Sequence, residues 1–125
     1  MYTIATEPAN RLVRITISGM LTVEQVASLY REEHAAIREM ACPLGQQVVL
    51  VDLRKCPLQF QEVVKTFKDK IGGEHSARRI ALVTGDSAAR MQARRIIERD
   101  GAALFATLAA AETWLLDATG SRAAA

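Results

Sequence analysis

The stretch Gln47-Val48-Val49-Leu50-Val51-Asp52-Leu53 decides the fold of this chain of 125 residues. It is a nearly continuous run of β-branched residues and leucine, which is typical of a strand buried on both faces of a sheet. Such strands occur mainly in parallel sheets. We therefore expect residues 47–53 to form the central strand of an α/β domain.

The sequence before this strand predicts an antiparallel hairpin and then a helix. Residues 2–6 and 12–17 alternate their side chains, and the turn residues 7–10 separate them. Thr22-Val23-Glu24-Gln25 matches a capping box, which satisfies free amides at a helix start. The helix is expected to end near Cys42-Pro43, because proline disfavours helical geometry in the residue before it. Its apolar stripe comprises Val23, Val26, Ala27, Tyr30, Ile37 and Met40.

The sequence after the central strand alternates helices and strands. A second amphipathic helix is predicted up to Ile71, followed by the stop signal Gly72-Gly73. A buried strand over 79–84, a turn and N-cap over 85–87 and a third helix over 88–99 follow. Residues 102–106 and 108–118 predict a last strand and a last helix. The apolar positions of the second helix are Phe60, Val63, Val64, Phe67 and Ile71.

These elements predict a single α/β domain over residues 1–118, with 119–125 as a flexible C-terminal tail. The order is ββαβαβαβα, with four main helices. Each strand-helix-strand crossover should be right-handed. We therefore expect a mostly parallel five-stranded sheet that begins with an N-terminal antiparallel hairpin.

The composition is that of a globular protein, with 50% hydrophobic and 24% charged residues and a net charge of +2. The N-terminal residues lack the basic start and apolar run of a secretory signal, and the longest apolar stretch is too short to span a bilayer. We therefore expect a cytoplasmic protein that does not span a membrane. In that reducing compartment Cys42 and Cys56 are expected to be free thiols.

Four segments of this sequence together resemble the SpoIIAA-like family, which is related to the STAS domains of sulfate transporters and anti-sigma factor antagonists. The segments open the first helix, form the central strand, form the next strand and close the chain. They read Ile17-Ser18-Gly19-Met20-Leu21-Thr22, Val48-Val49-Leu50-Val51-Asp52-Leu53, Arg79-Ile80-Ala81-Leu82-Val83-Thr84-Gly85, and Phe105 through Ala111 to Trp114-Leu115-Leu116.

The resemblance implies parallel strands in sequential order and a non-enzymatic adaptor or ligand-binding module. In the anti-sigma antagonist branch, a serine or threonine is phosphorylated at the start of the helix after the central strand. Here that region reads Leu58-Gln59-Phe60-Gln61-Glu62 and contains no hydroxyl. The serine phospho-switch is therefore not expected in this chain.

Ligands of parallel sheets bind beyond the carboxyl ends of the strands, so the candidate sites are two loops, residues 52–59 and residues 84–90. In the second loop, backbone amides at a helix start together with Arg90 form a potential anion seat, although Asp86 or Ser87 as a simple cap is the alternative. The candidate binding residues are Asp52, Cys56, Gln59, Thr84, Gly85, Asp86, Ser87, Arg90 and Arg94.

The candidate residues leave two interpretations of Cys56 open. Arg54 and Lys55 are cations that lower a thiol pKa, whereas a free cysteine in a loop usually just packs.

His34 lies at the edge of the apolar stripe of the first helix, either as a base or as a packed ring. No motif indicates a cofactor, and the histidines and cysteines lack metal-ligand spacing.

The third helix is predicted to carry Arg90, Arg94, Arg95 and Arg99 around Met91 on its outward face. Such a face contacts an acidic surface or is simply solvated charge. No specific nucleic-acid binding is expected, because aromatic residues are not interleaved with the arginines.

Three functions remain open from the sequence. The first is a STAS-like regulatory or interaction module that binds a protein partner or a small ligand. The second is a carrier of a small apolar ligand or lipid, based on the kinship of the fold with lipid-transfer domains. The third is a thiol or acid/base enzyme that uses Cys56 or Asp52. A homodimer through the open edge of the first strand is a further alternative.

Overall fold

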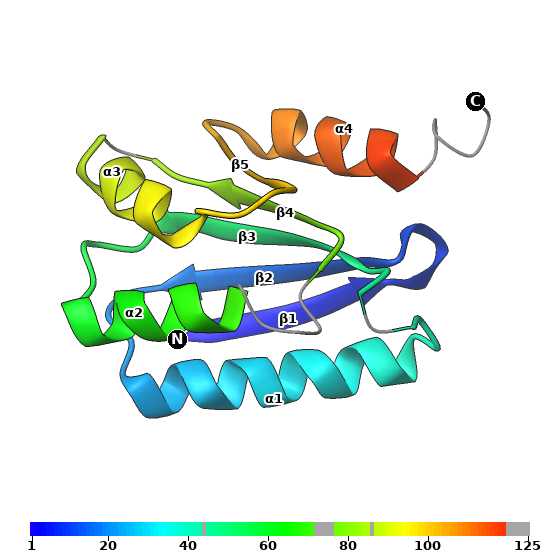
Figure 1. The fold of residues 1–125 in the computed structure, drawn as a ribbon, viewed down its shortest axis with the longest axis horizontal. Coiled ribbons are helices and arrows are strands. Elements are labelled where there is room, and N and C mark those ends of the chain that lie inside the picture. Colours follow the sequence, from blue (N-terminus) through cyan, green and yellow to red (C-terminus); the bar gives the residue numbers. More distant parts are fainter. Residues whose placement is uncertain (44, 72–76, 86, 120–125) are drawn as a thin grey trace.

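The fold is defined by a computed structural model that describes residues 1–43, 45–71, 77–85 and 87–119 (Figure 1). The strands are β1 (Tyr2–Glu7), β2 (Leu12–Ser18), β3 (Val48–Lys55), β4 (Arg79–Val83) and β5 (Ala102–Phe105). The helices are α1 (Val23–Glu39), α2 (Gln61–Ile71), α3 (Ser87–Ile96) and α4 (Leu108–Thr119), with a short 3-10 helix, Pro8–Asn10, between β1 and β2.

The five strands form one sheet in the order β1-β2-β3-β4-β5, which Figure 1 shows as neighbours in chain order. β1 and β2 are antiparallel, and every later neighbouring pair is parallel. The predicted fold class, strand order and central position of β3 are therefore confirmed. β3 begins at Val48, one residue after the predicted Gln47, and runs on to Lys55.

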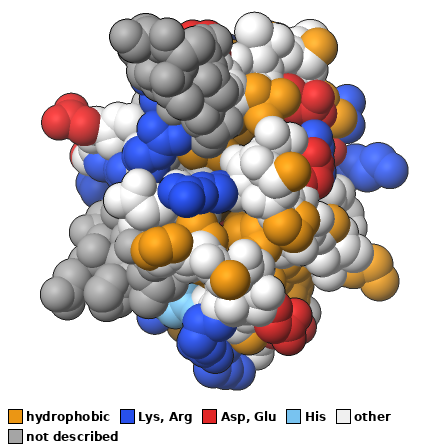
Figure 2. All heavy atoms as spheres, turned by 90° about the vertical axis from the view of Figure 1, so that its right-hand side faces the viewer, with side chains coloured by type: hydrophobic (Ala, Val, Ile, Leu, Met, Phe, Trp, Pro, Cys, Tyr) orange, Lys and Arg blue, Asp and Glu red, His pale blue; other side chains and the backbone are white. Residues whose placement is uncertain are grey.

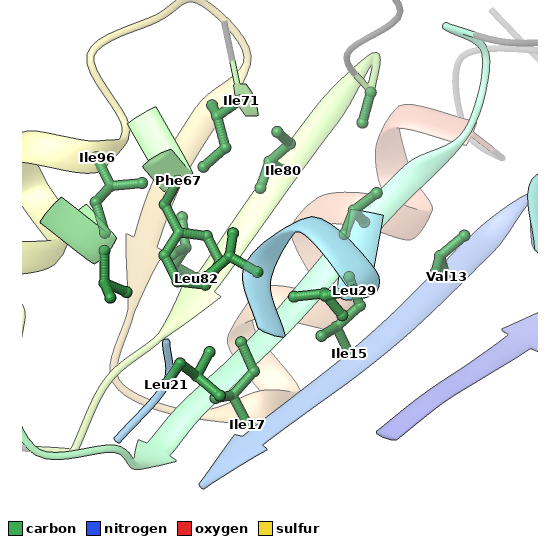
Figure 3. Close-up of a cluster of buried hydrophobic side chains, with 14 of the residues drawn as sticks. Val13, Ile15, Ile17, Leu21, Leu29, Phe67, Ile71, Ile80, Leu82 and Ile96 are labelled. Carbon is green, nitrogen blue, oxygen red and sulfur yellow. The ribbon is translucent and has the colours of Figure 1, made fainter. Parts of the chain in front are cut away.

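Helices cover both faces of this sheet. A sheet that grows in one direction through right-handed crossovers places the connecting helices on the same face. The larger core lies on that face, where Ile15, Phe67 and Ile96 bring together β2, α2 and α3 (Figure 3). α4 lies on the other face, where Ala111 and Leu115 pack with Leu50 of β3 and Val83 of β4.

Local chemistry sets both ends of α1. At its start, the Gln25 amide N–H donates to Thr22 Oγ1 over 3.1 Å and the Thr22 N–H donates to Gln25 Oε1 over 2.8 Å, which confirms the predicted capping box. At its end, Ala41 adopts a left-handed φ of 57°. This turn ends α1 at Glu39, before the proline that was expected to stop it.

Two residues that were predicted to be on buried stripes are exposed instead. Val23 is the first residue of α1, and Phe60 precedes α2, so both lie where the helix has not yet turned onto the sheet. The predicted third helix is also shorter, since α3 ends at Ile96. The stop signal Gly72-Gly73 and residues 120–125 of the predicted tail lie outside the described residues.

Candidate functional site

The carboxyl ends of β2, β3 and β4 and the starts of the following helices form one edge of the molecule (Figure 1). The loop after β4 touches the end of β3 there, because a Cβ on Gly85 would lie only 3.3 Å from the backbone oxygen of Arg54. Glycine at position 85 therefore allows this close approach. Close packing therefore explains the glycine at this position without a ligand.

Three of the predicted site residues meet at this edge on the face of α1, α2 and α3. Cys56, Gln59 and Thr84 line a shared cavity of about 40 Å³. Ligand pockets usually measure about 300–1,000 Å³, so this space is too small for a typical ligand. Thr84 Oγ1 is buried and has no hydrogen-bond partner among the described residues. The cavity is otherwise largely apolar.

Asp52 lies on the opposite face of the sheet, since its register neighbours are Thr16 and Val83 and Val83 packs against α4. Both of its carboxylate oxygens accept hydrogen bonds of 2.9 Å from the guanidinium of Arg54. These hydrogen bonds hold the pKa of Asp52 below its usual range. An ionised carboxylate held in this way is not poised to accept a proton at neutral pH.

The thiol of Cys56 is packed rather than activated. Its Sγ donates to the backbone oxygen of Ile17 over 3.3 Å. Burial is the main reason that its pKa rises to about 11, so the thiol stays protonated at neutral pH. The hypothesis that Arg54 and Lys55 lower this pKa is therefore wrong. As predicted, both Cys42 and Cys56 are free.

Gln59 joins three segments of this edge. Its Oε1 accepts a hydrogen bond of 2.9 Å from the Leu21 N–H, and its Nε2 donates to the Gly19 and Pro57 oxygens over 3.0 Å. Its backbone is held by Gln92 of α3, whose Oε1 accepts from the Gln59 N–H over 2.8 Å and whose Nε2 donates to the Gln59 oxygen over 2.9 Å. The amide of Gln59 is therefore used to hold the loops together.

Four exposed apolar residues adjoin this hydrogen-bond network along the chain, and we call them the apolar rim. Each is a direct sequence neighbour of a residue in the network, so the network holds them at one edge. Large exposed apolar residues are informative when they cluster. The rim consists of Met20 (43% exposed), Leu58 (51%), Phe60 (64%) and Met91 (66%).

This arrangement was not predicted from the sequence, although two signals for it were present. Gln92 lies at helical spacing between Ala89 and Ile96 of the apolar stripe, which indicates a polar group that bonds inward. Phe60 stands one residue before its helix begins. The pairing of Gln92 with the backbone of Gln59 joins parts of the chain 33 residues apart, and periodicity cannot predict it.

The arginines of the third helix do not share one environment. Arg94 and Arg95 are exposed on α3, and Arg90 is half-buried. Arg99 lies beyond the helix, and its Nη2 donates to the Ala77 oxygen over 2.7 Å. The prediction that Arg99 belongs to the outward face of the helix is therefore wrong.

The predicted anion seat falls largely outside the described part of the chain. α3 begins at Ser87, as the sequence predicted to within one residue. Asp86 is not among the described residues, and neither is the side chain of Ser87. The seat formed by Thr84, Gly85, Asp86 and Ser87 therefore stays a prediction.

Within residues 1–43, 45–71, 77–85 and 87–119, no three His, Cys, Asp or Glu side chains gather in a way that suits a metal ion. No helix in the same part of the chain has the length and apolar character needed to cross a membrane.

Comparison with solved structures places this architecture in a known fold. An anti-sigma factor antagonist from Mycobacterium paratuberculosis superposes with a TM-score of 0.63 at 15% identity, covering 92% of this chain and 94% of that one. An uncharacterised protein of the DUF3478 family with a SpoIIAA-like fold, from Shewanella loihica PV-4, gives a TM-score of 0.62 at 16% identity and covers 92% of each chain. No family model and no curated protein matches the sequence.

The fold of this chain is therefore SpoIIAA-like, as the sequence resemblance implied. At these identities the likeness concerns the fold, and function has to be argued from the residues at the edge described above.

Proposed function

We propose that this protein is a non-enzymatic, STAS-like regulatory module that binds a protein partner through the apolar rim. The observation that carries the proposal is the position of Leu58 and Phe60 on either side of Gln59. Both side chains are exposed, while the amide between them is fully engaged. The backbone beneath the rim is thus ordered before a partner binds, which lowers the entropy lost on binding.

The residues beside the rim indicate the chemistry of the partner. Arg94 and Arg95 lie three and four positions after Met91 on α3, which places them next to it on the helix surface. A partner that presents apolar side chains flanked by acidic ones would complement this surface. The structural likeness to an anti-sigma factor antagonist supports a regulatory role.

Regulation through phosphorylation of the segment before α2 is not part of this proposal. Leu58, Gln59 and Phe60 lie in that segment, followed by Gln61 and Glu62 in the helix, and none carries a hydroxyl. We also propose a cytoplasmic location, because both cysteines are free thiols. Pairing of two copies along the open edge of β1 stays a prediction.

The test is affinity capture with purified protein as bait, read by quantitative mass spectrometry and followed by calorimetry with the captured protein. The baits are the wild type, Phe60→Ser with Met91→Ser, and Arg90→Glu with Arg94→Glu. Ala109→Asp is the control, because it adds a charge to an exposed position of α4, on the other face of the sheet.

We expect one protein to bind the wild type and the control alike. Phe60→Ser with Met91→Ser should bind this protein at least about tenfold more weakly than the wild type does, since buried aromatic contacts dominate interfaces. The arginine variant should weaken it more at low salt than at high salt. Unchanged affinity in the rim variant would exclude the rim as the docking surface.

A second function, carriage of a small apolar ligand, is favoured by a separate observation. A cavity of about 540 Å³ lies between α1, α2 and the sheet. Its volume is within the usual range for small-molecule pockets. Native mass spectrometry of freshly purified protein tests this function, because a carrier should retain its ligand as an added mass.

A further inference from the structure

The cavity between α1 and α2 lies on the same face of the sheet as the apolar rim, but toward the amino ends of β3 and β4. Ile15, Val49 and Ile80 form its floor on the sheet, and Ile71 adds to its wall. Figure 2 shows the end of the molecule to which the C-terminal half of α1 runs, with hydrophobic side chains visible between charged ones. The surface of the cavity is mostly apolar, but several polar side chains of α1 and α2 also line it.

Glu33 of α1 is the most unusual of these polar groups. It lines the cavity and is only 6% exposed. Among the described residues, no hydrogen bond or ion pair reaches its carboxyl group. Burial raises the pKa of this carboxyl to about 7. Buried carboxylates in proteins are normally paired, because an unpaired charge loses its hydration without compensation.

The groups around Glu33 do not supply that pair. Tyr30 lies one helical turn before it, is half-buried and also lines the cavity. Gln47 uses its Oε1 to accept a hydrogen bond of 2.8 Å from the Gly45 N–H. The other titratable groups of the lining are His34 of α1 and Asp69 and Lys70 of α2, and both residues of α2 are exposed.

We propose that this cavity binds a small molecule with an apolar body and one protonated amine, and that the ammonium group pairs with the carboxylate of Glu33. The apolar body would pack against Ile15, Val49 and Ile80. This inference rests on the second function proposed above and names its ligand class. Among the described residues that line the cavity, the carboxylates of Glu33 and Asp69 outnumber the ammonium group of Lys70, and His34 is the further titratable group, so a cation fits better than an anion.

A second explanation of the buried Glu33 needs no ligand: its carboxyl group could be protonated. A protonated Glu33 is neutral and can remain buried without a pair. The two explanations differ in one respect, because only a cation-binding site distinguishes an amine from an alcohol of the same size. Hexylamine and hexanol are therefore matched probes.

The experiment measures the affinity of both probes for the full chain by NMR titration at about pH 8.5. An alkylamine is then protonated, since the pKa of the lysine amine is about 10.4. The variants are Glu33→Gln, which keeps the size of the side chain, and Thr66→Phe, which enlarges a side chain in the cavity wall. Glu39→Gln is the control, because Glu39 is an exposed glutamate of the same helix.

We expect wild type and Glu39→Gln to bind hexylamine at least about tenfold more tightly than hexanol, as charge-assisted hydrogen bonds are the strong ones. Glu33→Gln should lose this preference and keep its affinity for hexanol, which also shows that the cavity is intact. Thr66→Phe should lower the affinity for both hexylamine and hexanol, because the larger side chain fills part of the cavity.

Three outcomes overturn the inference. If hexanol binds as well as hexylamine, the cavity accepts apolar ligands and the carrier function stands without amine recognition. If neither probe binds at millimolar concentration, both the inference and the carrier function fail. If hexylamine binds equally to wild type and Thr66→Phe, the amine binds elsewhere on the surface.

Discussion

The two ends of the face formed by α1, α2 and α3 use their polar side chains in opposite ways. At the carboxyl end, Gln59 and Gln92 satisfy each other and the neighbouring loops, and apolar side chains are exposed around them. At the amino end, apolar and polar side chains line a cavity, and Glu33 is left without a pair among the described residues. A satisfied network gives a rigid surface, whereas a buried acid without a pair loses hydration free energy that no partner offsets.

The largest effect should come from Glu33, through the dependence of stability on pH. Its pKa rises from 4.5 to about 7 on folding, so the folded state holds a proton that the unfolded state releases. Stability from this group is complete below pH 4.5 and is lost as the pH rises through 7. The loss amounts to about 3 kcal/mol at 1.36 kcal/mol per pKa unit.

Urea unfolding of wild type and Glu33→Gln between about pH 4 and pH 8.5 measures this contribution. The stability of Glu33→Gln relative to wild type should rise by about 3 kcal/mol over that interval. Glu39→Gln should show no such trend, since Glu39 is exposed. A constant difference between Glu33→Gln and wild type would mean that Glu33 is solvated or paired in solution.

The next effect concerns the network at the other end. Gln59→Ala removes three side-chain hydrogen bonds and leaves the Leu21 N–H and the Gly19 oxygen unpaired. We expect a loss of about 2 kcal/mol in the free energy of unfolding. Gln61→Ala is the control, because Gln61 is exposed at the start of α2 and should change stability by less than about 0.5 kcal/mol. Equal effects of the two variants would show that the network does not hold the loops.

A smaller effect distinguishes the arginines. Arg99→Ala removes the hydrogen bond to the Ala77 oxygen and should destabilise the fold by about 1 kcal/mol. Arg94→Ala should leave stability within about 0.5 kcal/mol, because Arg94 is exposed on α3. Thermal unfolding of both variants measures the difference. A greater loss in Arg94→Ala than in Arg99→Ala would contradict these assignments.

The smallest effect on stability is expected in the apolar rim. Phe60→Ser should change the free energy of unfolding by less than about 0.5 kcal/mol, since Phe60 is 64% exposed. Phe67 is the matched reference, because it is an aromatic residue of the adjoining helix but is 8% exposed, and Phe67→Ala should cost about 3 kcal/mol. A large destabilisation by Phe60→Ser would place Phe60 in the core and remove it from the docking surface.

Much of the fold followed from local patterns. The β-branched run at β3, the capping box at Thr22 and the amphipathic spacing of α2 each reflect a requirement within a few residues. The errors fell at helix ends, where Val23 and Phe60 fit the apolar spacing of their helices but are exposed in the structure. Periodicity describes which residues share a helix face, and the first turn extends beyond the sheet on which that face packs.

The candidate site was harder to predict, because a residue type does not say whether its polar atoms are already used. Cys56 and Asp52 were chosen for their chemistry, and burial and an ion pair with Arg54 hold each in an unreactive state. Glu33 was not chosen, although it lies seven positions after Val26 on the buried stripe of α1. An acidic residue on an apolar stripe was the available signal.

The sequence by itself determined the order of elements and the sheet, because hydrophobic periodicity and turn residues act over short distances along the chain. The tertiary structure alone decided which side chains are satisfied, exposed or buried without a pair. Gln59 meets Gln92, and Glu33 meets the cavity wall of α2, only when helices distant in sequence pack on one sheet. Such contacts depend on the three-dimensional packing of whole elements, which a local pattern does not contain.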